Sequence, residues 1–271
     1  MPDVLTDFSR ASLERSVKAN LYDFLKLMGR SPAAAVVEDG PLISWHTALP
    51  HPWFNGVLAS RTAPHDAECL IAGRLAYFQE RGVASVSWWL EPHVEATDWQ
   101  PHLLRAGFRV DDHTPGMAVD LSKLRAPAQK RHGLEVVPVQ DDAALHAWLP
   151  PFLAGYGLPT TLLESLVELF TGLGFGLPLR QYLGYLDGEP VATSSLYLGA
   201  GVAGIYNVAT RAEARGGGIG TELTVAPLRD AQEFGYKVGI LQSSKKGFSL
   251  YLRLGFEQVC VMNHYIWQAG G

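Results

Sequence analysis

The residues with the clearest chemical potential form a glycine-rich segment in the second half of the chain. It reads Arg215-Gly-Gly-Gly-Ile-Gly-Thr221, and it lies between an expected strand at 204–209 and an expected helix after Gly220. Consecutive glycines let backbone N–H groups turn toward one point, because no Cβ atom blocks the approach. The free N–H groups and the positive end of the following helix favour an anion. The pattern therefore predicts a phosphate cradle.

The spacing of these glycines excludes two common phosphate-binding motifs. A dinucleotide fingerprint requires G-x-G-x-x-G, but Gly216 and Gly218 are followed by Thr221 where the third glycine should stand. A P-loop requires Lys after its last glycine, whereas Gly220 is followed by Thr221. The motif that fits is Arg215-x-x-Gly218-x-Gly220.

A second segment with chemical potential follows roughly 30 residues later. It reads Leu241-Gln-Ser-Ser-Lys-Lys-Gly-Phe-Ser-Leu-Tyr-Leu-Arg-Leu-Gly-Phe256, and it predicts a short helix that ends at a glycine. In this order, the two segments resemble the GNAT acetyltransferase superfamily. Its acyl-CoA loop reads Gln/Arg-x-x-Gly-x-Gly/Ala between a strand and a helix, and its closing segment carries Tyr-x-x-x-Gly-Phe. The resemblance covers residues 133–267 well and residues 41–121 only faintly.

The resemblance implies a fold and a reaction. The fold is α/β (α+β), with two tandem GNAT-like domains, each a mostly antiparallel twisted mixed sheet flanked by helices. The reaction is direct attack of an amine on the thioester of acetyl-CoA, with no acyl-enzyme and no metal. In this family, strand geometry opens a gap beside the loop strand, and backbone groups there hold the pantetheine arm.

The resemblance also implies roles for individual residues. Val208 supplies backbone groups to the pantetheine and an amide to the acetyl oxygen, and Ser244 with Phe248 lines the thiol end. Tyr251 donates a proton to the leaving thiolate, since a phenol with a pKa near 10 is close enough to a thiol near 8.5. The expected coenzyme A contacts are Val208, Ala209, Thr210, Arg215, Gly216, Gly217, Gly218, Ile219, Gly220, Thr221, Ser244, Phe248 and Tyr251.

The general base and the acceptor are not legible in the sequence. Tyr206 and Asn207 lie beside the expected thioester site, but neither is a carboxylate. Glu164 and Glu168 share one face of an expected helix, where a solvated surface explains them as well as a base does. Proton loss through water to bulk solvent is an equal alternative. Four aromatic residues favour an apolar acceptor lining or, equally, a plain core: Phe152, Tyr156, Phe170 and Phe175.

Matching segments indicate that the chain is built from two related halves. Leu75-Ala-Tyr-Phe-Gln-Glu-Arg-Gly82 and Leu228-Arg-Asp-Ala-Gln-Glu-Phe-Gly235 each predict a helix tail, a glycine stop and then a short strand. Leu103-Leu-Arg-Ala-Gly-Phe108 matches Tyr251-Leu-Arg-Leu-Gly-Phe256 in the same way. Each half then ends in an expected strand, at 116–121 and 259–267. We predict a first domain at 1–125 and a second at 133–271.

The first half lacks the residues that make a cradle. The positions that match the glycine loop read Thr62-Ala-Pro-His-Asp-Ala67, where proline removes an amide donor and aspartate repels phosphate. Leu103 stands where the second half has Tyr251. The first half is therefore expected to bind no cofactor, to pack against the second half and to shape the substrate cleft.

The elements of the second half follow from its periodicity. We expect a strand at 134–139 and then a helix capped by Asp141 or Asp142 and stopped by Pro150-Pro151. A second helix is expected at 160–173, followed by a hairpin whose turn is Asp187-Gly188. With the loop strand and the two later strands, this order predicts helices on a mostly antiparallel sheet.

Composition limits the classes of partner. The chain has 271 residues and a formal net charge of −5, which excludes a broad basic nucleic-acid surface but leaves room for a small cationic pocket. Its two cysteines cannot form a disulfide framework, and its nine histidines show no metal spacing. No signal peptide or membrane span is evident, so we expect a cytoplasmic monomer or homodimer.

These observations together predict an acetyl-CoA-dependent N-acetyltransferase acting on a small-molecule amine. Three alternatives stay open. One is a mycothiol-synthase-like acyltransferase acting on an amino sugar conjugate. Another is an enzyme that uses a different acyl-CoA. The third is an acyl-CoA-binding regulatory module without turnover.

Overall fold

Eleven strands form one continuous sheet in the computed structural model, which describes residues 4–40, 42–59, 66–91, 96–127 and 131–270. Their order is β1-β2-β3-β4-β11-β5-β10-β9-β8-β7-β6, and only β3–β4 and β9–β10 of these pairs are parallel. This confirms the predicted fold class. In chain order the strands are β1 (Ala34–Asp39), β2 (Leu42–Thr47), β3 (Gly56–Ala59), β4 (Ser85–Leu90), β5 (Arg109–Asp120), β6 (Leu134–Pro138), β7 (Leu179–Leu186), β8 (Glu189–Gly199), β9 (Val202–Thr210), β10 (Val238–Gln242) and β11 (Glu257–Gln268).

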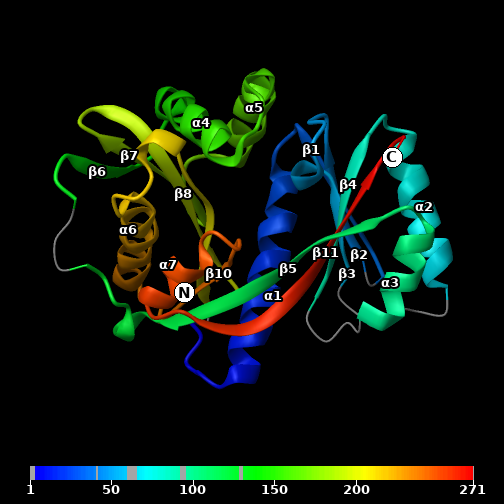
Figure 1. The fold of residues 1–271 in the computed structure, drawn as a ribbon, viewed down its shortest axis with the longest axis horizontal. Helices are drawn as coiled ribbons and strands as arrows, with labels where there is room; N and C mark the ends of the chain where they lie inside the picture. The colour runs from blue at the N-terminus through cyan, green and yellow to red at the C-terminus, as the bar shows by residue number, and fades with distance from the viewer. Residues whose placement is uncertain (1–3, 41, 60–65, 92–95, 128–130, 271) are drawn as a thin grey trace.

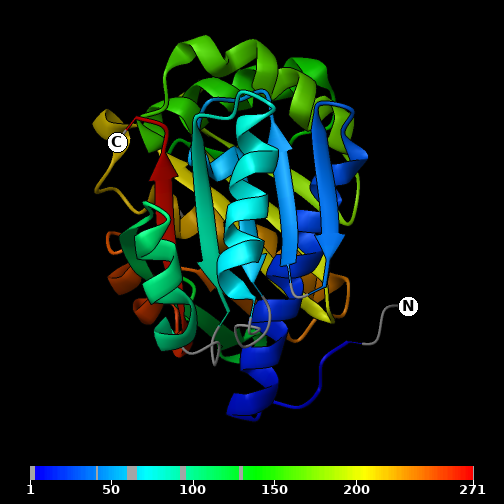
Figure 2. The ribbon, with the colours of Figure 1, turned by 90° about the vertical axis from the view of Figure 1, so that its right-hand side faces the viewer.

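Helices cover the sheet on both sides. In Figure 1, α6, α4 and α5 lie with the strands of the second half, and α2 and α3 cover the far side of the first. Figure 2 shows α2 lying across strands of the first half. The helices are α1 (Arg10–Leu27), α2 (Ala67–Gln79), α3 (Ala96–Arg105), α4 (Asp142–Tyr156), α5 (Leu163–Leu173), α6 (Ile219–Glu233) and α7 (Phe248–Arg253).

The last strand of each half is built into the sheet of the other half. β5, from the first half, pairs with β10, and β11, from the second, pairs with β4. β5 and β11 also pair with each other and cross the middle of the molecule (Figure 1). The backbone hydrogen bonds of the sheet therefore run without a break from one half to the other. The division at 1–125 and 133–271 stays a prediction.

The matching segments take matching structures. α2 and α6 are each followed by a glycine in the left-handed region, Gly82 at φ 70° and Gly235 at φ 88°. α3 and α7 are likewise followed by Gly107 at φ 87° and Gly255 at φ 94°. These φ values favour glycine because a Cβ atom is strained there. The repeat inferred from the sequence is thus a repeat of local structure.

The predicted end of the first helix of the second half is wrong. Asp141 caps α4 as expected, accepting a hydrogen bond from the Ala144 N–H at 2.8 Å. However, the helix runs through Pro150 and Pro151 to Tyr156. Each proline removes one helical hydrogen bond, but the turn that follows buries Phe152 and other apolar side chains in the core. Tertiary packing outweighs the local cost.

Helix α1 has no counterpart among the predicted elements, although it lies between the two halves (Figure 1). It buries an apolar stripe that includes Val17, Leu21 and Leu25. Its Asn20 is fully buried, donates to the carbonyl of Gly199 at 2.9 Å and accepts from the hydroxyl of Tyr206 at 2.8 Å. The first half thereby supplies a wall and an anchor to the second.

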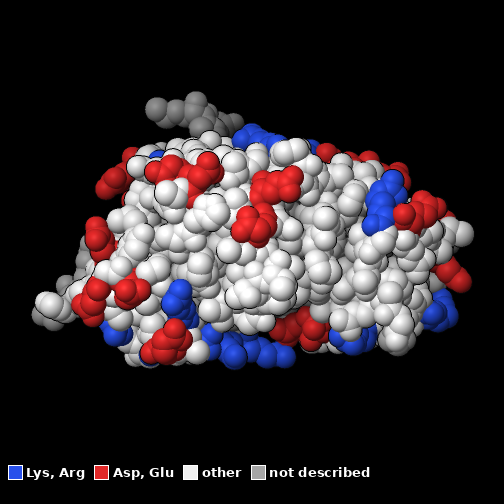
Figure 3. Space-filling view, turned by 90° about the horizontal axis from the view of Figure 1, so that it is seen from above, with Lys and Arg blue, Asp and Glu red and all other residues white. Residues whose placement is uncertain are grey.

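One face of the molecule shows how charge is distributed. Seen from above, with α4 and α5 toward the viewer, acidic groups are scattered over an uncharged surface and Lys and Arg lie mainly at its edges (Figure 3). The described residues visible on this face form no contiguous basic field. Such a surface does not suit a nucleic-acid backbone.

Candidate active site

The parallel strands β9 and β10 diverge in the middle of the second half. They pair from Ala203–Gly239 to Ile205–Leu241, but β9 continues to Thr210. The backbone of β9 beyond Ile205 therefore has no partner on the β10 side. The result is a gap between two strands that start as neighbours, with unpaired backbone groups along one edge.

A β-bulge bends β9 at the point where this pairing ends. Asn207 has a φ of 54°, and the register with β8 shifts between Thr193 and Ser195. Two hydrogen bonds hold the bulge. The Thr193 hydroxyl donates to the backbone carbonyl of Asn207 at 2.9 Å, and the side-chain amide of Asn207 donates to the Ser195 hydroxyl at 3.0 Å. Bulges increase local twist and re-aim the strand. This one accompanies the opening of the gap.

The glycine loop lies at the outer end of the gap. Gly216 and Gly218 have φ values of 85° and 80°, and an added Cβ would meet open space at both. Gly218 is the N-cap residue of α6, so the free N–H groups of the first helical turn face the loop. The guanidinium of Arg215 donates to the carbonyls of Thr210 at 3.1 Å and Gly155 at 3.0 Å. Arg215 therefore ties the loop to β9 and α4.

A cationic pocket of about 490 Å³ adjoins the loop. Arg125, Arg131 and Arg253 line it together with Gly218 and Thr221. Arg131 lies close over the loop, since a Cβ on Gly217 would collide with its guanidinium. Arg125 is the last residue of the predicted first domain, and Arg131 lies between the two predicted domains. No local signal in the sequence shows that the segment between the two predicted domains returns to the glycine loop.

Tyr251 lies at the inner end of the gap. It belongs to α7, is 8% exposed and lines a cavity of about 390 Å³ together with Val208 and Ser244. Burial raises the pKa of Tyr251 to about 12, so the phenol is protonated at neutral pH. Tyr156 lines the same cavity and donates to the Val208 carbonyl at 3.2 Å.

The cavity around Tyr251 is lined by both halves of the chain, and we call it the aromatic cavity. α1 contributes Phe24, the first half contributes Trp45 and Trp89, and α4 and α5 contribute Phe152 and Phe170. Its volume is in the range of small-molecule sites. The aromatic side chains that line it are Phe24, Trp45, Trp53, Phe54, Trp89, Phe152, Tyr156, Phe170, Tyr206 and Tyr251.

Residues 145–256 match the family model described as the Acetyltransferase (GNAT) family. This part of the chain is a GNAT domain. The match contains β9, the glycine loop, α6, β10 and α7, which are the elements that form the gap. No curated protein matches the chain significantly in sequence.

Solved structures extend the GNAT likeness to the whole chain at the level of the fold. A GCN5-related N-acetyltransferase from Kribbella flavida aligns with a TM-score of 0.67 and 18% identity, over 93% of this chain and 96% of that one. A second, from Sphaerobacter thermophilus, has a TM-score of 0.60 and 17% identity, over 86% and 82%. A tandem GNAT protein from the clavulanic acid biosynthesis pathway has a TM-score of 0.55 and 14% identity, over 95% and 96%.

Most of the residues predicted to contact coenzyme A lie along the edges of the gap between β9 and β10. Val208 to Thr210 lie on the part of β9 that extends beyond its pairing with β10, and Ser244 and Tyr251 line the aromatic cavity. The side chain of Ile219 is buried in the core, so only its backbone N–H is available. The side chain of Phe248 packs in the hydrophobic cluster beside Tyr251 and lines neither described pocket.

The residues weighed for the acceptor side divide in the same way. Phe152, Tyr156 and Phe170 line the aromatic cavity, whereas Phe175 packs against the core beside it. Glu164 and Glu168 are exposed on α5 and line neither described pocket. Their position fits the solvated helix face rather than a general base. Residues 62–65 of the first-half counterpart of the loop lie outside the described residues.

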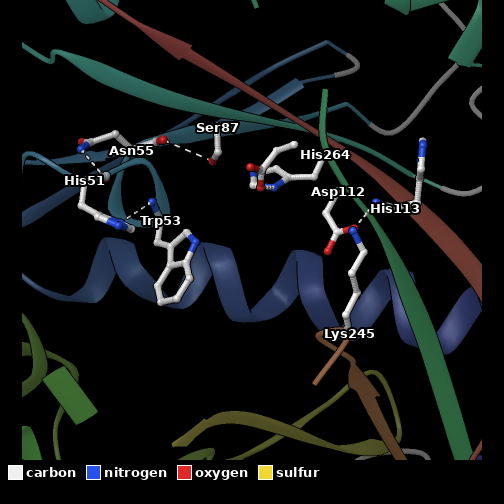
Figure 4. A network of polar contacts seen from close by, with 9 residues as sticks. His51, Trp53, Asn55, Ser87, Asp112, His113, Lys245 and His264 are labelled. Atoms are coloured by element: carbon white, nitrogen blue, oxygen red, sulfur yellow. Dashed lines mark hydrogen bonds and ion pairs between the residues drawn. The ribbon is translucent and has the colours of Figure 1, made fainter. Parts of the chain in front are cut away.

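A polar group in the aromatic cavity has no counterpart in the sequence interpretation. His264 of β11 lies 2.9 Å from Asp111 of β5, and Asp112 of β5 forms an ion pair with Lys245 at 3.0 Å. Figure 4 shows Asp112 and His264 on one side of β5 and His113 on the other. These residues are far apart in sequence, and only the exchange of β5 and β11 makes them neighbours.

The described residues were also compared with the requirements of a metal site and of a membrane-spanning helix. None of their groups of His, Cys, Asp and Glu has an arrangement that suits a metal ion. None of their helices combines the length and hydropathy needed to cross a bilayer.

Proposed function

We propose that this protein is an acyltransferase that moves the acetyl group of acetyl-CoA to the amine of a small molecule. The observation that carries the proposal is the gap between β9 and β10. It connects the glycine loop and its arginine-lined pocket at one end with Tyr251 and the aromatic cavity at the other. A nucleotide-bearing thioester has the same order of parts: a phosphorylated end, a long amide-bearing arm and a reactive end.

The residues present fit such a co-substrate. Gly216 and Gly218 leave open space and free N–H groups for a diphosphate, and the positive end of α6 favours its charge. Arg125, Arg131 and Arg253 suit a further phosphate, because guanidinium groups bind phosphate oxygens in pairs. The unpaired edge of β9 offers backbone groups to the amides of the arm.

When bound, acetyl-CoA supplies an activated acyl group, and this chain's own groups prepare the transfer. The Val208 amide lies on the unpaired edge of β9, where an N–H stabilises a developing negative charge on oxygen. The Val208 carbonyl is already occupied by Tyr156. Tyr251, held protonated by burial, carries the proton that the leaving thiolate requires. The aromatic walls of the cavity place apolar surface beside the reacting groups.

The first test separates binding from turnover. Isothermal titration calorimetry with acetyl-CoA is expected to show one site per chain. Thiol release from acetyl-CoA, measured with Ellman's reagent, is expected only when an amine is added. Binding without thiol release for any amine would instead indicate a regulatory module, and no binding at all would refute the proposal.

Tyr251→Phe tests the proton donor. We expect kcat to fall about 100-fold, because general-acid catalysis contributes on that order, while the Kd for acetyl-CoA stays within about twofold. Tyr185→Phe is the matched control, because Tyr185 lies on β7 and lines neither described pocket. A loss in Tyr251→Phe of less than about threefold would show that the donor is another group.

A further inference from the structure

The polar part of the aromatic cavity is built by the two exchanged strands. His264 of β11 pairs with Asp112 of β5, but the next pair is Tyr265 with Val110. Asp111 is therefore the extra residue of a β-bulge in β5. A bulge turns a side chain that strict alternation would send to the other face. Here it brings the Asp111 carboxylate to Nδ1 of His264, at 2.9 Å.

His264 is held in one orientation with one nitrogen unused. Its side chain is 4% exposed, lines the aromatic cavity and stacks on Trp89 with ring centroids 4.2 Å apart. Asp111 occupies Nδ1, whereas Nε2 is buried and has no hydrogen-bond partner among the described residues. A buried polar atom without a partner is costly in a native protein. The unused nitrogen therefore points to a ligand that the cavity receives.

The charges around this histidine suit a cationic ligand. Asp111 and Asp112 line the cavity, and none of its described lining residues is Lys or Arg. Lys245 pairs with Asp112 from the loop after β10, and Glu91, just after β4, is paired with Lys18 of α1 at 3.5 Å. Asp111, whose side chain is 41% exposed, keeps only the histidine as a described partner, so this carboxylate of the lining has no Lys or Arg paired with it.

The His264 ring is neutral in the free protein and can therefore accept a proton. Burial lowers the pKa of His264 below its usual value, although Asp111 and Asp112 act in the opposite direction. The ring is thus neutral at neutral pH, with Nδ1–H donating to Asp111 and the lone pair on Nε2. The tyrosines of the cavity stay protonated, because burial raises the pKa of Tyr206 and Tyr251.

An ion pair links the carboxylates near His264 to the segment that carries Ser244, beside Tyr251. Lys245 directly follows Ser244, which lines the cavity beside Tyr251, and its ion pair joins that segment to Asp112. The remaining walls are aromatic and aliphatic, including Trp45 and Phe152. A ligand between them has an apolar body and presents its cationic end to Asp111 and His264.

We propose that the acceptor of this enzyme is a primary amine with an aromatic or apolar body, and that His264 is its general base with Asp111 as a positioning residue. The inference rests on the proposed function. Nε2 of His264 takes one proton from the ammonium, and the freed lone pair of the amine forms a C–N bond to the acyl carbon. The C–S bond breaks, Tyr251 gives its proton to the sulfur, and the second proton lost by the nitrogen restores Tyr251. The proton on His264 leaves to solvent.

The substrate class is tested with two sets of amines and acetyl-CoA. Phenethylamine, tyramine and tryptamine form the apolar set, and ethanolamine, putrescine and glucosamine form the polar set. We expect kcat/KM to be at least about tenfold higher for the best apolar amine than for any polar one. Equal or higher values for a polar amine overturn the substrate class while the proposed function stands. Failure to bind acetyl-CoA by calorimetry overturns the proposed function itself.

The base is tested with His264→Asn, and His113→Gln is the control. His113 is an exposed histidine on the other side of β5. For the best amine at about pH 7, His264→Asn is expected to lower kcat/KM about 100-fold with the Kd for acetyl-CoA unchanged, whereas His113→Gln has no effect. An unchanged Kd also shows that the variant is folded. A loss below about threefold overturns the role of His264.

The pH profile distinguishes a base from a merely structural residue. In the native protein, log(kcat/KM) is expected to rise with pH and to level off above a midpoint below 6.5, where His264 is neutral. In His264→Asn only free amine reacts, so the rise should continue toward the pKa of the amine, about 10. Asp111→Asn should shift the native midpoint downward, because Asp111 raises the pKa of His264. Identical profiles in all three proteins overturn the proposal.

Discussion

The two halves of this chain share one architecture, but the corresponding parallel strands behave differently. In the first half, β3 pairs with β4 over its whole length, from Gly56–Ser87 to Ala59–Leu90. In the second half, β10 leaves β9 after Leu241, and β9 continues to Thr210 paired with β8 alone. The strand order alone therefore does not make a site. The proposed site combines a bulge that bends one strand with a glycine loop where the strands separate, and we expect this loop to bind the diphosphate.

A charged residue in the glycine loop should produce the largest effect. Gly218→Asp places a carboxylate and a strained left-handed residue where the diphosphate is expected, so the Kd for acetyl-CoA should rise about 100-fold or more by calorimetry. Gly40→Asp is the control from the first half, since Gly40 also has a positive φ, 55°, and open space. Unchanged binding in Gly218→Asp would remove the distinction between the halves.

Removing the link between the halves should have an intermediate effect. Asn20→Ala removes the hydrogen bonds of a fully buried side chain with the part-buried carbonyl of Gly199 and the hydroxyl of Tyr206, so the free energy of unfolding should fall by about 2 kcal/mol. Urea denaturation measures this loss. Asn263→Ala is the control, because the contact of Asn263 with His113 is exposed. A loss in Asn20→Ala no larger than in the control would show that α1 does not couple the halves.

The smallest expected effect is a difference in reactivity between the two cysteine thiols of the unmodified protein. Cys69 of α2 is exposed, whereas Cys260 of β11 is buried, and burial raises the pKa of its thiol to about 12. At about pH 8 the thiolate form of Cys260 is rare, so Ellman's reagent should titrate one thiol in the native protein and two in guanidinium. Rapid reaction of both would show that the seam between β5 and β11 opens readily.

Local patterns predicted local structure well. The capping of α4 by Asp141, the hairpin turn at Asp187-Gly188 and the glycine stops after α2 and α6 follow from residues that are adjacent in sequence. The glycine loop and Tyr251 were legible because a motif of fixed spacing carries them. The predicted helix end at Pro150 and Pro151 was wrong, because burial of the following turn outweighs the two helical hydrogen bonds that the prolines remove.

The proposed acceptor side of the site was not predictable from local patterns. His264 and Asp111 are 153 positions apart, and their contact depends on a bulge and on the exchange of two strands. Neither feature leaves a periodic signal. The same holds for Arg131, which reaches the glycine loop from the segment between the two predicted domains, and for Phe24, which enters the cavity from α1.

The exchange of β5 and β11 also fixes when the protein can finish folding during synthesis. Among the described strands, β4 gains its second neighbour from β11, which spans residues 257–268. Until those residues leave the ribosome, the half that is translated first exposes an open edge that other strands can join. A premature stop codon just before β11 would therefore damage the amino-terminal half, although every residue assigned to that half had already been made.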